Sequence, residues 1–144
     1  MSGPAMLTRA VLFIAGAAIG GVAVAGVPAR LLLPLSDADE TAGTETGCTA
    51  AFRAGRSDYV QLIGVELTIR TAAGLHLCRL SGRTADAVLA GQAGASCGGY
   101  RVAVRQTGRT KTYPASDSSS TPAVLTVGEG HAATTLRGDW GVAC

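Results

Sequence analysis

Hydrophobic residues are distributed unevenly along the 144-residue chain. Residues 10–29 (AVLFIAGAAIGGVAVAGVPA) contain no charge and follow a single base, Arg9. A run of this length spans a bilayer, and the charges that flank it predict a cytoplasmic amino terminus and an exported remainder. We therefore predict one N-terminal hydrophobic helix in residues 1–29. Small residues at 23–25 and 27–29 are suitable for signal-peptide cleavage, so a cleaved signal peptide and an uncleaved signal anchor both stay open.

The next stretch is acidic and lacks a periodic apolar face. Residues 34–47 (PLSDADETAGTETG) contain four acids and no base. This composition is typical of a solvated spacer. We assign an acidic linker to residues 30–47 and the folded exported domain to residues 48–144.

Alternation of apolar and polar residues, the signature of a half-buried strand, dominates that domain. It is clearest in residues 59–70 (YVQLIGVELTIR), where Val65, Leu67 and Ile69 alternate with polar neighbours. Val102 and Val104 alternate with Arg101, Ala103 and Arg105 in the same way. Both stretches predict strands with one face in the core.

Weaker signals indicate the remaining elements. Leu75 and Leu77 alternate across His76, which predicts a strand with a solvated histidine. Val88 and Leu89 form a short apolar stretch that predicts another strand, although residues 84–90 carry a trace of a helical apolar face.

Turn residues divide these strands. Thr107-Gly108 predicts a hairpin turn before residues 109–113, residues 116–122 (SDSSSTP) a loop, and residues 128–130 (GEG) a turn before a last strand at 131–137. Many short strands with glycine turns predict an all-β fold, a small immunoglobulin-like β-sandwich.

The cysteine pattern adds disulfides to this fold. Four cysteines occur, all on the exported side: Cys48, Cys78, Cys97 and Cys144. An even number outside the membrane segment predicts two disulfides, and no closely spaced pair suggests zinc. Three connectivities are open. We favour the sequential one, Cys48 with Cys78 and Cys97 with Cys144, because each bond then closes a segment of complete strands.

Composition and charge narrow the function. The net charge is +2, aromatic residues are 4% of the chain and mean hydropathy is +0.31. These values do not indicate a nucleic-acid binder. The predicted hairpin nevertheless carries a basic patch formed by Arg101, Arg105, Arg109 and Lys111. Such a patch suits an anionic envelope polymer, an acidic envelope protein or lipid headgroups, and it equally suits a plain solvated face.

No set of residues predicts catalysis, so we expect the chain not to be an enzyme. Residues 94–98 (GASCG) fit GxSxG, and Asp117 and His131 follow in the order of a hydrolase triad. That motif requires a strand, a sharp turn and a helix in a parallel sheet, whereas here a strand follows. Two histidines without metal-site spacing predict no metal and no cofactor. For Trp140, beside Cys144, we expect packing against a disulfide.

Three segments together resemble an actinobacterial family of exported domains of unknown function. The folded domain begins with Cys48-Thr49-Ala50, as members do, and residues 78–82 (CRLSG) match a Cys-x-Leu-x-Gly motif. Residues 124–136 (VLTVGEGHAATTL) are similar to a late segment with paired glycines and a closing leucine. Thr71 replaces the usual asparagine. The resemblance implies an immunoglobulin-like β-sandwich outside the membrane and no activity or catalytic residues.

Residues 123–135 also resemble the first strand and turn of bacterial subtilisin inhibitors. Only residues 136–144 follow, so the family's reactive loop has no counterpart here. We expect a non-catalytic binding or accessory domain of the cell envelope, secreted or anchored in the membrane through residues 10–29. A small secreted protease inhibitor and a single-helix subunit of a membrane complex are the alternatives.

Overall fold

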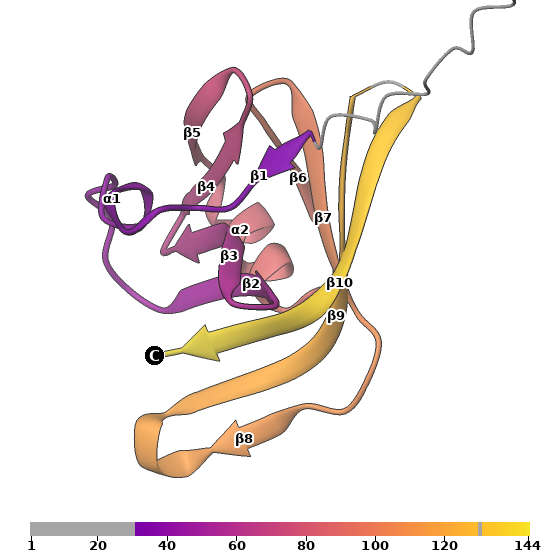
Figure 1. Ribbon diagram of the computed structural model, residues 1–144. Helices are drawn as coiled ribbons and strands as arrows, with labels where there is room; N and C mark the ends of the chain where they lie inside the picture. Colours follow the sequence, from indigo (N-terminus) through magenta and orange to yellow (C-terminus); the bar gives the residue numbers. More distant parts are fainter. Residues whose placement is uncertain (1–30, 130) are drawn as a thin grey trace, which may run out of the picture.

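The computed structural model describes residues 31–129 and 131–144 (Figure 1). The predicted hydrophobic helix in residues 1–29 lies outside this part of the chain. Within the described part, no helix is long and apolar enough to cross a bilayer. The elements in chain order are β1 (Leu32–Leu33), α1 (Asp37–Glu40), β2 (Thr49–Ala54), β3 (Ser57–Ile63), β4 (Glu66–Thr71), β5 (Gly74–Arg79), α2 (Gly82–Leu89), β6 (Gly94–Cys97), β7 (Tyr100–Gln106), β8 (Lys111–Tyr113), the 3-10 helix η1 (Pro114–Ser116), β9 (Ser118–Glu129) and β10 (Ala132–Ala143).

All strands belong to one antiparallel sheet. Its order is β5-β4-β3-β2-β10-β9-β7-β6, while β1 pairs with the end of β4 and β8 with the start of β9. The sheet curls until the outer strands β5 and β6 meet, where a disulfide joins Cys78 to Cys97. Its two halves thus enclose one core, as the layers of a sandwich do. The predicted all-β, disulfide-bonded fold is confirmed.

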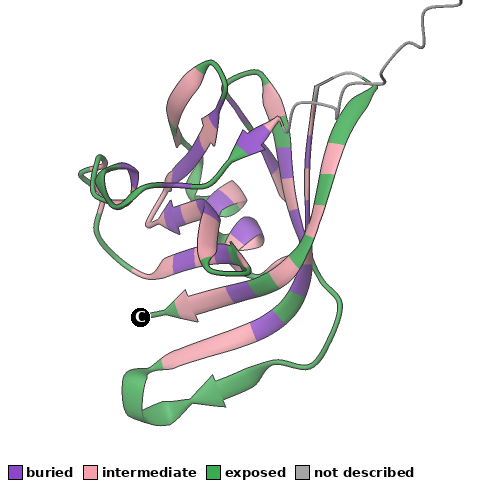
Figure 2. Cartoon of the chain, viewed as in Figure 1, coloured by how far each residue is buried: buried purple, intermediate pink, exposed green. Residues whose placement is uncertain are grey.

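The core consists of buried residues from both halves of the sheet and from α2, coloured purple in Figure 2. Phe52, Leu67, Ile69 and Trp140 have no exposed surface. Trp140 is the largest of them, and its indole N–H donates a hydrogen bond of 2.9 Å to the carbonyl of Leu89 at the end of α2. The one polar atom of the indole is therefore satisfied inside the core, and it ties α2 to the sheet.

The disulfide connectivity corrects the sequential prediction. The bonds are Cys48–Cys144 and Cys78–Cys97, with sequence separations of 96 and 19. Thr49 lies opposite Ala143 in the β2–β10 pair, so the residues just outside this pair are adjacent. The cysteines are thus paired by neighbouring strands that are distant in sequence, which spacing alone does not show.

The spacer prediction is wrong for residues 32–40. Leu32 and Leu35 are buried, and the amide of Leu35 donates to the carbonyl of Asp58 at 2.8 Å. Asp39 is buried too and accepts two hydrogen bonds from the guanidinium of Arg70, while Ser36 caps α1. The acidic composition hid two buried leucines and one buried carboxylate.

Several predicted elements also differ from the structure. Residues 59–70 form two strands, because Gly64, with φ of +57°, turns the chain between β3 and β4. The 116–122 loop is mostly strand, since β9 begins at Ser118. Residues 88–89 end the helix α2 rather than forming a strand.

The predicted phase of β5 is inverted. Leu77 is 43% exposed, whereas His76 is half-buried and its ring lies 3.0 Å from the hydroxyl of Thr71. The disulfide at Cys78 draws that side of the strand toward β6. His76 is therefore not the solvated residue that the alternation predicted.

Candidate functional site

The β9–β10 hairpin contains the two longest strands of the described part. Its strands are twelve residues long and pair from Glu129–Ala132 to Ser118–Ala143. Every second residue of β9, from Thr121 to Val127, is buried, so the residues between them face outward. The outward side chains of β9, with those of β7, β10 and β2 beside them, form the outer face of the sheet.

Three arginines come together on this outer face, and we call them the basic face: Arg101, Arg105 and Arg137. Val124 of β9 lies directly opposite both Arg105 on β7 and Arg137 on β10. Two strand spacings therefore separate these arginines, about 10 Å between backbones. Arg101 is four residues from Arg105 on β7, roughly 13 Å along the strand. All three are exposed, and none forms a salt bridge with a described side chain.

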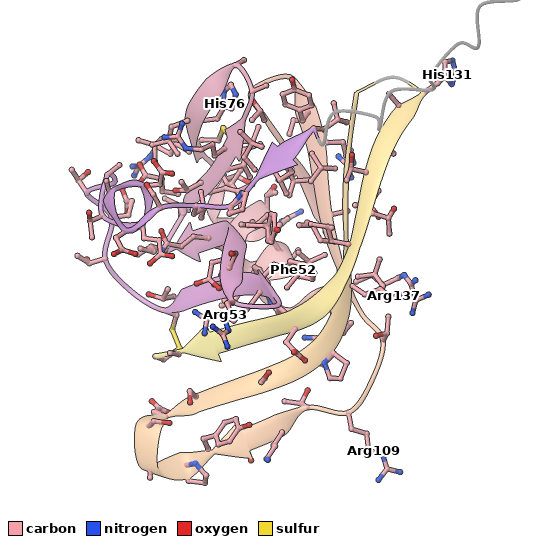
Figure 3. All side chains as sticks on the ribbon, viewed as in Figure 1. Phe52, Arg53, His76, Arg109, His131 and Arg137 are labelled. Atoms are coloured by element: carbon pink, nitrogen blue, oxygen red, sulfur yellow. A yellow bond between two sulfur atoms is a disulfide. The ribbon has the colours of Figure 1, made fainter. Side chains whose placement is uncertain are left out.

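The predicted patch is divided by the fold. Residues 100–113 do not form a hairpin, because β7 pairs with Ala123–Gly128 of β9 and β8 with Ser118–Ser120. Arg109 lies in the connecting loop, and the ammonium of Lys111 lies 5.3 Å from the ring centre of Tyr113. Both residues are exposed, but Lys111 pairs with Ser120 at the start of β9, and Figure 3 shows Arg109 apart from Arg137.

Arg137 is the member of the basic face that sequence reasoning missed. It lies in the predicted last strand at 131–137, most of which belongs to β10, where Leu136 is half-buried and Arg137 exposed. Its partnership with Arg105 depends on β7 and β10 lying on opposite sides of β9. To find Arg137, sequence reasoning would have needed the order of the strands in the sheet, not only their positions along the chain.

A shallow groove lies at the other end of the outer face. It has a volume of about 350 Å³ and lies between β2, the start of β9 and the end of β10. Its charged wall is Arg53, which donates two hydrogen bonds, of 2.7 and 3.1 Å, to Asp58. This pairing raises the pKa of the guanidinium and neutralises its charge. Ser118 and Ser120 add hydroxyl groups and Asp139 a second carboxylate, so the groove is polar and contains more acidic than basic side chains.

The residues of the apparent hydrolase triad are far apart. Asp117 precedes β9 and His131 follows it, at opposite ends of a strand of about 40 Å (Figure 3). Ser96 is exposed on β6, and no helix follows it. The described residues also contain no group of three metal-ligating side chains.

The cysteines indicate where the domain resides. All four form disulfides, so the fold requires an oxidising environment such as the outside of the cell. Comparison with known proteins adds nothing further, since no family model, characterised protein or solved structure matches the chain significantly. The two sequence resemblances therefore stay predictions.

Proposed function

We propose that this chain is an exported, non-catalytic binding domain of the cell envelope that holds an anionic partner on the basic face. One observation carries the proposal. The fold brings Arg101, Arg105 and Arg137 onto one face without acidic partners in the described part, whereas Arg53, Arg70 and Arg79 each pair with a carboxylate. The charge of the basic face is thus available to another molecule.

The surroundings of the three arginines suit an extended partner. In the strand register, Gly128 and Ala133 lie in the same row as Arg101. Thr126 and Thr135 lie in the row between Arg101 and the row that contains Arg105 and Arg137. These residues are small, so a polymer or peptide backbone can approach the sheet closely. Each guanidinium offers a planar set of donors that matches a carboxylate or phosphate group.

Export and the envelope location rest on two supports. The disulfides favour an oxidising compartment, and residues 10–29 predict translocation. Without cleavage, that segment anchors the domain at the membrane. A subunit of a membrane complex would stay with the membrane, and a secreted inhibitor would be released. Fractionation of an expressing host, with N-terminal sequencing, separates these forms.

The binding test uses the processed chain recovered from that host. We compare the parent with R101E/R105E and with R56E/R83E, a control that makes the same charge change at exposed arginines outside the basic face. Sedimentation with isolated envelope, and with anionic and neutral vesicles, is measured at low and high salt. We expect binding to envelope that is lost only in R101E/R105E and weakens with salt, since screening acts over about 8 Å at physiological ionic strength.

Equal and salt-independent sedimentation of all three proteins would show that the basic face is ordinary solvated surface. Binding to anionic vesicles, but not to envelope stripped of lipid, would identify headgroups as the partner.

A further inference from the structure

The two halves of β10 have different neighbours. Residues 139–143 pair with β9 on one side and with β2 on the other. Residues 132–138 pair with β9 alone among the described strands. In antiparallel strands every second residue turns its N–H and C=O toward the same edge. The segment Ala132–Arg137, which we call the free edge, therefore presents backbone donors and acceptors without a strand partner in the described part.

The free edge lacks the usual protection of an edge strand. It contains no proline and no lysine, and its only charge, on Arg137, faces outward. Ala132, Ala133 and Thr135 are exposed, and Thr134 and Leu136 are half-buried (Figure 2). The edge begins sharply at Gly138, where an added Cβ would overlap the carbonyl oxygen of Arg53. β2 thus closes the sheet up to Gly138, and no described strand continues it beyond.

The strand order determines how much chain fits there. Two strands, β2 and β3, lie between β10 and β4 at one end of the sheet. At the other end β1 pairs with Arg70 and Thr71 of β4, in line with β3 (Figure 1). Among the described strands, this register leaves one strand position between β10 and β1. Because β10 and β1 run in the same direction, a strand that is antiparallel to one is antiparallel to both.

We propose that the free edge receives an extended segment of a partner protein, which adds one antiparallel strand beside β10. A second copy of this chain does not fit, because its β10 brings β9 with it and needs two positions. The proposed function has residues 10–29 cleaved or inserted in the membrane, which leaves this position to another polypeptide. That step rests on the proposed function, and the proposal names the partner's class as polypeptide.

The side chains of the free edge indicate which sequence pattern the partner segment should have. Partner residues beside Ala133, Thr135 and Arg137 lie on the outer face. An acidic residue there lies one strand spacing from Arg137, and Arg105 lies two spacings farther along the same row. Residues beside Thr134 and Leu136 lie on the inner face, next to the core that Leu136 contacts. A segment of about six residues that alternates acidic and apolar side chains therefore fits both faces.

Amide hydrogen exchange of the full-length chain, purified in detergent, tests the proposal. The probe is a seven-residue peptide of alternating valine and glutamate. Its controls are the valine–lysine peptide and two versions that are N-methylated at every second residue, one in each phase. We expect alternate amides between residues 132 and 137 to exchange fast in the parent and at least ~10-fold more slowly with the probe. The lysine peptide and at least one methylated peptide should give no protection.

Three results would overturn the added strand. The first is binding of the probe without slower exchange at the free edge, in which case the basic face still binds acids and the proposed function survives. The second is slow exchange before any peptide is added, which would mean that another segment of the same chain pairs with the free edge. The third is protection that rises with protein concentration alone, which assigns it to a second copy. Conversely, probe-dependent protection that R101E/R105E leaves unchanged would support the strand and argue against the basic face.

Discussion

The two ends of the β9–β10 hairpin perform different tasks with the same backbone. At one end β10 is bordered on both sides, Trp140 is buried and hydrogen-bonded to Leu89, and Cys144 is covalently joined to Cys48. At the other end β10 has one described neighbour, and Arg137 is exposed. Burial and cross-linking stabilise the first end, while the second leaves a charge and the backbone groups of one edge without a described neighbour. A long hairpin can therefore be rigid where it is enclosed and available where it is not.

The first prediction removes the covalent bond of the enclosed end. Replacing both Cys48 and Cys144 with serine should lower the free energy of unfolding by up to about 4.7 kcal/mol, the loop-entropy value for a loop of roughly 100 residues. Urea unfolding measures it. C78S/C97S, which opens the shorter loop, should cost about 3 kcal/mol. Peptide mapping without reduction provides the check, and a Cys48–Cys78 peptide would contradict the structure.

The second prediction concerns the boundary between the two ends. Gly138→Ala introduces a Cβ against the carbonyl of Arg53 and the ring of Phe52, so strands β2 and β10 must move apart. We expect a loss of about 1–3 kcal/mol, as for other overpacked sites. Gly82→Ala, at a position with open space, serves as the control and should be neutral or slightly stabilising. Equal melting of both variants would show that β2 does not close tightly against Gly138.

The third prediction tests, through the pH dependence of stability, the ion pair between Arg70 and Asp39. The hydrogen bonds from Arg70 hold the pKa of Asp39 well below its usual range, and the amide of Ser36 adds to this. A lowered folded-state pKa gives stability that is complete above the unfolded value of about 3.9 and is lost as pH falls below it. Thermal melts between pH 6 and 2 should therefore decline less steeply for Asp39→Asn than for the parent. Asp37→Asn, exposed on the same helix, should follow the parent.

The smallest effect on stability is expected at Arg137, in the half of β10 that pairs with β9 alone among the described strands. Arg137→Glu should change the free energy of unfolding by less than about 0.5 kcal/mol, because the side chain is exposed and forms no described ion pair. Arg70→Glu, which places a carboxylate beside the buried Asp39, should destabilise the fold clearly more. Chemical denaturation of the two variants gives the comparison. A large loss in R137E would mean that the basic face supports the fold rather than binding.

Local pattern predicted part of the fold. Val102 and Val104 are buried as their alternation indicates, as are Leu67 and Ile69. These strands have one face toward the core, so periodicity alone identifies them. The pattern failed at Leu77, where a disulfide next along the strand determines which side faces inward.

The pairing of strands that are distant in sequence could not be predicted from local patterns. The disulfide partners and the basic face depend on which strands are neighbours, and β2 and β10 are almost a full domain apart in sequence. The Thr107-Gly108 turn signal misled for the same reason, because β9 is long enough to pair with β7 and β8 in succession. Arg101 and Arg105 were found as candidates, whereas Arg137 required the register.

The Cys48–Cys144 disulfide also determines the order in which this domain is completed. As the chain is made from its amino terminus, Cys48 emerges 96 residues before its partner, whereas Cys78 is followed by Cys97 after only 19. The inner ring can therefore oxidise early, while β2 waits for β10 and keeps an unpaired edge until the last strand arrives. The strand β10 therefore completes both the pairing with β2 and the larger disulfide ring, so the centre of the sheet closes only after residues 132–144 have been made.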